Sequence, residues 1–152
     1  MDHAITDDQA MQAALDEAVD AEVAGEVPIG AVVVRDGVIV SRGQNRVLRD
    51  NDPTAHAEVV ALRAAAAAIG NYRLSGCTLV ATLEPCAMCA GTLIHARVER
   101  LVYGAADPKA GAAGSVLSVV NHPALNHQMT VQGGVMAEES ASLLRGFFQR
   151  RR

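Results

Sequence analysis

The sequence has few cysteines, no long apolar run and no basic residue near its start, and each shortage excludes a class of protein. Three cysteines are an odd number, and two of them lie three positions apart, which is poor material for a disulfide framework and suits metal binding in a reducing compartment. No segment approaches the roughly 18 to 20 uncharged apolar residues that cross a bilayer, and no secretory signal pattern opens the chain. We therefore expect a soluble, cytoplasmic protein without membrane association.

The length of the chain limits its domain organisation. Its 152 residues, half of them hydrophobic, suffice for one compact domain with its own core and are too few for two ordinary domains. No linker, repeat or low-complexity tract divides the sequence. We expect residues 1–152 to form a single domain.

Charge is distributed unevenly along the chain. The net charge of −4 argues against a nucleic-acid partner, because neutralising phosphates needs local positive charge. However, residues 1–26 hold eight acidic side chains and no Lys or Arg, which leaves 13 basic against nine acidic residues beyond them. An arginine cluster at the C-terminal end fits either phosphate contact or a solubilising helix end, and it consists of Arg145, Arg150, Arg151 and Arg152.

Four helices are predicted from apolar residues at helical spacing and from capping signals, over 6–24, 53–69, 86–95 and 136–148. Thr6 and Gln9 have the form of a capping box at the start of the first helix. Its expected apolar face, which should cover a sheet, consists of Met11, Leu15, Val19 and Val23. Asp52 followed by Pro53 predicts a cap and a first-turn proline at the start of the second helix.

Five strands are predicted, over 29–34, 38–40, 77–82, 100–103 and 129–131. Asp36 and Gly37 favour a tight turn, so the first two strands should form a hairpin. The alternation of strand and helix favours a parallel pairing between the strands at 77–82 and 100–103. A Gly- and Ala-rich loop over 105–115 and a short element near 116–120 account for the remaining segment.

Two motifs place metal-binding residue types at the starts of the second and third predicted helices. His56 lies in the first motif, and Cys86 and Cys89 lie in the second, directly after Pro85. Cysteines three apart on a helix present their sulfurs on one face, and the exposed N–H groups of the first turn favour the thiolate form that zinc requires. With the imidazole they make three protein ligands, which leaves a fourth position for water, as in a catalytic zinc site.

Glu58 has a different expected role. Two residues from His56 on a regular helix, its side chain would point away from the histidine and would not share the metal. A carboxylate beside zinc-bound water can take a proton from it and pass the proton to a ring nitrogen and then to the departing amine, as hydrolytic deamination requires. Cys77 could instead close the site as a fourth ligand, although its strand position favours a buried apolar role.

The combination of these motifs in this order is the signature of zinc nucleobase deaminases, and the chain resembles the bacterial tRNA-specific adenosine deaminase family. The resemblance covers nearly the whole length, including 52–58, 71–74, 83–91, 111–115, 121–127 and the C-terminal phenylalanines followed by arginines. It implies an α/β fold of the cytidine-deaminase-like type, a three-layer α/β/α sandwich with a mixed five-stranded sheet, and a homodimer. It also implies hydrolytic deamination of adenosine to inosine at the wobble position of the anticodon of an arginine tRNA, by zinc-activated water.

The resemblance further implies a set of substrate-binding residues. By position, Asn45 is similar to the residue that hydrogen-bonds the flipped base, and Asp107, Lys109 and Asn126 lie in loops expected to hold the anticodon strand. From the residues alone, Asn45 could end a strand, Asp107 could start a turn, and Asn126 could cap one.

The aromatic and remaining histidine side chains have a structural and a functional interpretation. Phe148 is a candidate for stacking on an unpaired anticodon base, yet an aromatic residue on an amphipathic final helix is usually core, which we expect for at least one of Phe147 and Phe148. Three histidines without ligand spacing are expected to have packing or loop roles, namely His95, His122 and His127. His3 is expected to lie in a frayed chain end.

Two alternative functions remain open. A deaminase of a free base or nucleoside, such as guanine or cytidine, would share the zinc signature without needing the 111–115 loop or the arginine tail. A non-catalytic tRNA-binding subunit that keeps zinc for stability would have lost the glutamate, and Glu58 is present.

Overall fold

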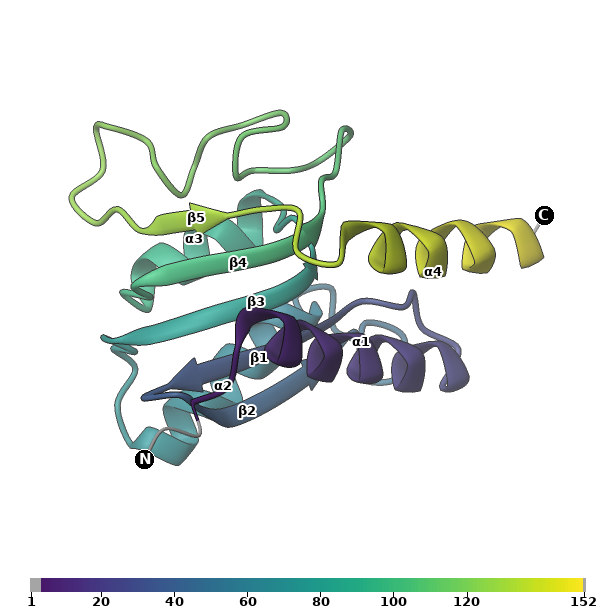
Figure 1. Cartoon of the computed structure of the whole chain (residues 1–152), viewed down its shortest axis with the longest axis horizontal. Coiled ribbons are helices and arrows are strands. Elements are labelled where there is room, and N and C mark those ends of the chain that lie inside the picture. The colour runs from purple at the N-terminus through teal and green to yellow at the C-terminus, as the bar shows by residue number, and fades with distance from the viewer. Residues whose placement is uncertain (1–3, 152) are drawn as a thin grey trace.

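The computed structural model of the protein describes residues 4–151, which build a five-stranded sheet in the order β2-β1-β3-β4-β5 (Figure 1). The strands are β1 (Gly30–Arg35), β2 (Val38–Gln44), β3 (Cys77–Leu83), β4 (Arg100–Ala105) and β5 (Thr130–Gln132). β1 pairs antiparallel with β2 and β3, whereas β3 with β4 and β4 with β5 are parallel. The mixed sheet, the hairpin and the parallel pairing are confirmed.

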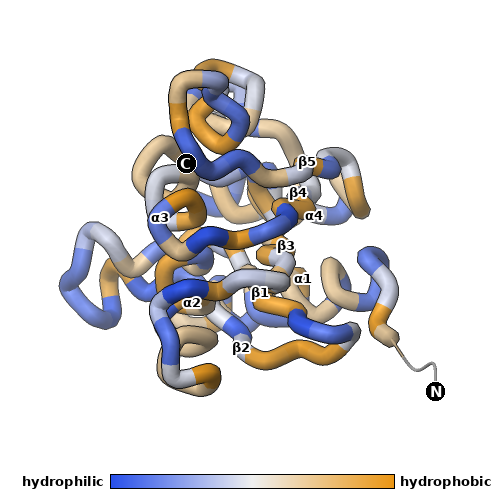
Figure 2. The backbone as a smooth tube through the Cα atoms, turned by 90° about the vertical axis from the view of Figure 1, so that its left-hand side faces the viewer, coloured by the Kyte–Doolittle hydropathy of each residue, from blue (hydrophilic) through white to orange (hydrophobic). Residues whose placement is uncertain are grey.

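Helices cover both faces of the sheet, as the side view in Figure 2 shows. α1 (Asp7–Val23) and α4 (Ala137–Arg150) lie on one face, and α2 (Ala57–Ile69) and α3 (Ala87–His95) lie on the other. None of these helices combines the length and apolarity that crossing a membrane requires. The structure is the three-layer α/β/α sandwich that the resemblance implied.

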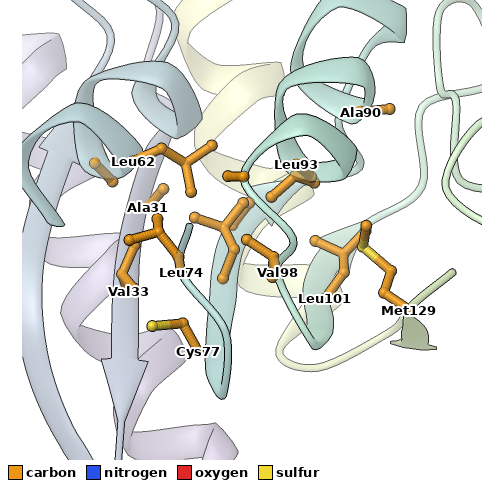
Figure 3. Close-up of a cluster of buried hydrophobic side chains, with 14 of the residues drawn as sticks. Ala31, Val33, Leu62, Leu74, Cys77, Ala90, Leu93, Val98, Leu101 and Met129 are labelled. Atoms are coloured by element: carbon orange, nitrogen blue, oxygen red, sulfur yellow. The ribbon is translucent and has the colours of Figure 1, made fainter. Parts of the chain in front are cut away.

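Alternating side chains of the central strands supply two separate cores. Ala31, Val33 and Leu101 belong to the cluster under α2 and α3, part of which Figure 3 draws. Their neighbours Val32 and Val102 belong to the cluster under α1, against which α4 also packs. The two-residue period of an extended chain sends successive side chains to opposite faces, and burial on both faces explains why these strands are almost wholly apolar.

The first helix begins as predicted but buries a different face. Thr6 and Gln9 form the capping box through reciprocal hydrogen bonds. Met11 and Leu15 are buried, whereas Val19 and Val23 are 44% and 85% exposed, so the predicted apolar face was wrong in its second half. In the second half of the helix the buried face consists of alanines, because the helix backbone lies very close to β1. A Cβ atom at Gly30 would overlap the backbone of Ala14 and Ala18.

The second helix begins later than predicted. The Oδ1 atom of Asp52 accepts hydrogen bonds from the backbone N–H and the hydroxyl of Thr54, at 2.8 and 2.7 Å. Asp52 therefore closes a turn instead of capping a helix, and α2 starts at Ala57 with His56 as its N-cap residue. The short element predicted near 116–120 is also wrong, since this segment is irregular apart from one isolated bridge between Ala113 and Ser118.

Candidate active site

Two helix N-termini bring the predicted metal ligands together. His56 is the N-cap residue of α2, and Cys86 is the N-cap residue of α3, both with extended backbone conformation. Cys89 lies one turn further along α3 and is completely buried. The Asp52–Thr54 turn precedes His56, and the end of β3 precedes Cys86. These two connections direct one imidazole and two thiols towards the same point.

The distances within this group match those of a metal site. The Nδ1 atom of His56 lies 3.6 Å from the Sγ atom of Cys86 and 3.5 Å from that of Cys89, and the three candidate ligand atoms lie within 4.8 Å of one another. Tetrahedral zinc with bonds of about 2.3 Å to sulfur and about 2.0 to 2.1 Å to nitrogen separates these two ligand types by about 3.5 to 3.6 Å. The three side chains are therefore spaced to hold a divalent cation.

Hydrogen bonding within the group polarises its protons. Hydrogen bonds from the Cys89 thiol and the His56 imidazole lower the pKa of Cys86 to about 3, while the same contact and burial raise the pKa of Cys89. The hydrogen bond to Cys86 raises the pKa of His56. A divalent cation bound by these three atoms would displace the protons that they share.

Glu58 lies in the first turn of α2, outside the group of candidate ligands. Its side chain is only 4% exposed. Burial raises the pKa of its carboxyl group, against the opposing effect of nearby His56. A buried carboxyl beside a metal-binding group can hold a proton and release it, which suits an acid–base catalyst.

Cys77 belongs to the core. It is fully buried among apolar side chains, in the same cluster as Val33 and Leu74 (Figure 3), and burial raises the pKa of its thiol. Cys77 begins β3 while Cys86 follows its end, and a strand of seven residues spans roughly 20 Å. Cys77 is therefore not a fourth ligand, and its predicted apolar role is confirmed.

The predicted substrate-binding residues fall into three places. Asn45 follows β2, is 8% exposed, and accepts the backbone N–H of Val47 through Oδ1. Asp107, Lys109 and Phe148 line one pocket of about 410 Å³ beside the end of β3. Asn126 lines a different pocket, of about 280 Å³, with Arg97 and His127.

Their local contacts also show the structural roles that the sequence left open. Asp107 starts a turn, because its Oδ1 atom accepts the backbone N–H groups of Lys109 and Ala110. Phe147 is buried, whereas the Phe148 side chain is 52% exposed, as expected for one core and one available ring.

Among the residues that the structure describes, His95, His122 and His127 lie outside the metal-binding group. His122 accepts the backbone N–H of Ala124 through Nδ1, and the Nε2 atom of His127 lies 2.7 Å from the Val98 carbonyl oxygen. These contacts fit the expected loop and packing roles. His3 and Arg152 lie outside the described residues.

Sequence reasoning missed the roles of two buried glutamates, Glu26 and Glu84, which are 1% and 2% exposed. Glu26 accepts backbone N–H groups from the segment after Asn45, and Glu84 accepts several from the segment that contains Asp107. Burial alone would raise the pKa of both carboxyl groups. Hydrogen bonds from the Ser115 hydroxyl to Glu84 and from the Arg49 side chain to Glu26, together with these backbone ones, outweigh burial and hold each pKa below its ordinary value. The only signal for Glu84 in the sequence is a charged residue placed between a buried strand and the Pro85–Cys86 pair.

Comparison with known proteins shows extensive similarity to deaminases. Residues 5–152 match the family model of MafB19-like deaminases. The tRNA-specific adenosine deaminase of Haemophilus influenzae is 49% identical over 147 residues, which cover 96% of this chain and 85% of the relative. A solved structure from a study of A-to-I editing by tRNA:A34 deaminases at the wobble position has 47% identity and a TM-score of 0.86, covering 89% of this chain and 98% of the other. A guanine deaminase from Nitrosomonas europaea has 27% identity and a TM-score of 0.79, covering 94% and 85%.

Proposed function

Because the chain belongs to the tRNA-specific adenosine deaminase family, we propose that it converts adenosine to inosine at the wobble position of a tRNA anticodon by hydrolysis. One observation carries the proposal: His56, Cys86 and Cys89 converge with metal-ligand spacing, and the buried carboxyl group of Glu58 lies next to them. Residues 1–152 are then a single zinc-dependent deaminase domain.

Zinc is the metal that this donor set fits, since one imidazole and two thiols are soft to borderline ligands. His56, Cys86 and Cys89 would hold the ion, and the location of Cys77 in the core leaves three protein ligands. When bound, zinc supplies the positive charge that activates a water molecule for attack on C6 of adenine.

Glu58 is the proposed acid–base catalyst. Its carboxylate accepts a proton from the attacking water and delivers it to the ring nitrogen N1, and a second proton transfer makes the exocyclic amine a leaving group. One water is consumed, and ammonia and inosine are formed. The burial that raises the pKa of Glu58 stabilises the protonated carboxyl group between the two transfers.

The substrate proposal rests on the relatives and on the pockets near the site. Bases of an anticodon loop are already unpaired, so extruding one costs less than it would from a duplex. Asn45 is the proposed hydrogen-bonding partner of the flipped base. The pocket of Asp107, Lys109 and Phe148 offers an amino group for phosphate and an exposed ring for stacking, as a flanking nucleotide requires, and Asn126 would contact the strand from the second pocket.

A homodimer is the proposed assembly. α2 and α3 border an apolar groove of about 370 Å³, and large side chains beside it are exposed, namely Tyr72 at 66% and Met88 at 36%. A second copy of the chain would cover this surface. We propose that the dimer acts in the cytoplasm on an arginine tRNA.

One assay tests the function. Purified zinc-loaded protein should form inosine in an anticodon stem-loop RNA of an arginine tRNA with adenosine at the wobble position, measured by nuclease digestion and chromatography. The same preparation should be inactive on free guanine and cytidine. Turnover of a free base without turnover of the RNA would contradict the proposal and favour the activity named for the guanine deaminase relative.

A further inference from the structure

A buried carboxylate without a cationic partner lies two residues before Cys86. The Glu84 side chain is 2% exposed, and none of the ion pairs among residues 4–151 includes it. Burying a charge is costly unless hydrogen bonds replace its hydration. The Glu84 carboxylate therefore needs several hydrogen-bond donors. The segment that supplies them is the one that the side chain holds in place.

All hydrogen-bond donors to the Glu84 carboxylate among the described residues come from the segment 107–115, which we call the substrate loop. Oε1 accepts the backbone N–H of Asp107 at 3.0 Å and the hydroxyl of Ser115. Oε2 accepts the backbone N–H groups of Ala113 at 2.9 Å and Ser115 at 3.1 Å. The loop thus encloses the carboxylate, as backbone N–H groups enclose an anion in a nest.

Gly111 shows how closely the substrate loop is fitted to Glu84. A Cβ atom at this position would overlap the carboxylate, so the loop backbone can lie against it only because residue 111 has no side chain. The backbone N–H of Ala112 also donates to the carbonyl oxygen of Pro85, at 2.8 Å. Two consecutive residues, Glu84 and Pro85, therefore hold the loop directly beside the ligand Cys86.

We propose that Glu84 is a positioning residue, which fixes the substrate loop relative to the metal-binding group and thereby places Asp107 and Lys109 for the RNA strand. The inference rests on the proposed function, because those two side chains are its proposed RNA contacts. Glu84 itself is not among the candidate metal ligands, and its carboxylate is enclosed by the loop. Its removal should weaken substrate binding and leave the chemical step largely intact.

Glu84→Gln tests this prediction, because the amide keeps the shape of the side chain but replaces one acceptor oxygen by an NH₂ group facing backbone N–H donors. In steady-state assays with the stem-loop in excess, the half-saturating RNA concentration should rise about tenfold or more, while the maximal rate stays within about threefold. The zinc content should stay at about one per chain. A change that only lowered stability would reduce the active fraction and would leave the half-saturating concentration unchanged.

A second variant removes one donor without altering the segment next to Cys86. Ser115→Ala should shift the half-saturating concentration in the same direction by a smaller factor, and adding it to Glu84→Gln should produce less than the product of the two effects. Glu99→Gln is the matched control, since Glu99 is an exposed carboxylate at the other end of β4 and should behave as the wild type.

Amide hydrogen exchange examines the same contacts without any substrate. The N–H groups of Asp107, Ala113 and Ser115 should be protected in the wild type and should exchange faster in Glu84→Gln. Failure of the wild type to deaminate RNA would overturn the proposed function, whereas exchange would still decide whether Glu84 holds the loop. The inference is overturned by unchanged protection, or by a Glu84→Gln variant that loses maximal rate at unchanged half-saturation.

Discussion

At the scale of single residues, the metal-binding group joins the starts of α2 and α3, so the loss of one of its cysteines should affect both metal binding and folding. Cys86→Ser should lower the zinc content from about one per chain to well under half and should lower the Tm, because a metal that binds only the folded chain contributes to folding. Elemental analysis and thermal unfolding measure the two effects. Cys77→Ala is the matched control and should keep its zinc, and loss of zinc from that variant would contradict the three-ligand site.

The buried carboxylate of Glu26 should make the stability of the protein depend on pH. This carboxylate accepts hydrogen bonds from the backbone N–H groups of Leu48 and Arg49 and from the side chain of Arg49. Burial opposes ionisation, but these hydrogen bonds lower its pKa below the ordinary value of 4.5. A folded pKa below the unfolded one stabilises the protein above about pH 4.5, and this stabilisation is lost as the pH falls through the folded pKa.

Glu26→Gln should therefore lower the free energy of unfolding at pH 7 by about 1 to 3 kcal/mol and flatten its decline below pH 4.5. Urea unfolding of the variant and the wild type at several pH values measures both effects. Parallel pH profiles for the two proteins would show that Glu26 contributes no such linkage.

The role of a single residue could be predicted from the sequence where its type and its spacing from other residues are enough to indicate that role. Cys86, Cys89 and His56 are such a case, because thiols and imidazoles have few alternative roles at junctions of this kind. Glu26 and Glu84 could not be predicted in this way, since most of their partners are backbone N–H groups of loops 22 to 31 residues away, which no residue type marks.

At the scale of elements, the strands and three of the four helix starts follow from local patterns, and the exceptions have local causes. Asp52 forms a turn with Thr54 because a side chain that can cap a helix can equally close a turn. The later start of α2 has a functional consequence, since it leaves His56 in an extended conformation directed at α3. The alanine face of α1 depends on its close approach to Gly30, a contact that no periodicity reveals.

The end of α4 carries a prediction about RNA binding. Arg150 pairs with Glu22 of α1, and the Arg151 guanidinium lies 4.3 Å from the centre of the Phe147 ring, so both have partners within the chain. If phosphates compete for these groups, deleting residues 150–152 should weaken stem-loop binding and reduce its salt dependence. Filter binding at several salt concentrations measures both, with exposed Arg35→Gln as the control. Unchanged affinity and salt slope would assign the arginines to the α1–α4 contact.

At the scale of the whole molecule, the layered fold separates the acidic helix from the proposed chemistry. α1 lies on the opposite face of the sheet from α2 and α3, whose N-termini hold the metal-binding group (Figure 2). Several acidic side chains of α1 and its start have internal partners, including Asp7 with Arg100 and Glu22 with Arg150. The net charge of −4 therefore does not describe the surface around the metal-binding group.

The order of the strands lies beyond what local sequence patterns can predict. β1 lies between β2 and β3, and β5 closes the opposite edge from β2, through pairings between segments far apart in the chain. Local periodicity identifies each strand but not its neighbour. The resemblance to a known family supplied the layers and the mixed sheet, and the described structure confirms both.

The central claim, that Glu58 moves protons for a zinc-dependent deamination, is tested most directly by single-turnover inosine formation in the Glu58→Gln variant. A glutamate that only interacts with the helix N-terminus would cost at most about 1 kcal/mol of stability on this change and would leave the rate nearly intact. The account predicts a folded variant with normal zinc content and stem-loop affinity, and a chemical step slower by at least about a hundredfold. A folded, zinc-loaded Glu58→Gln protein with a near-normal single-turnover rate would contradict it.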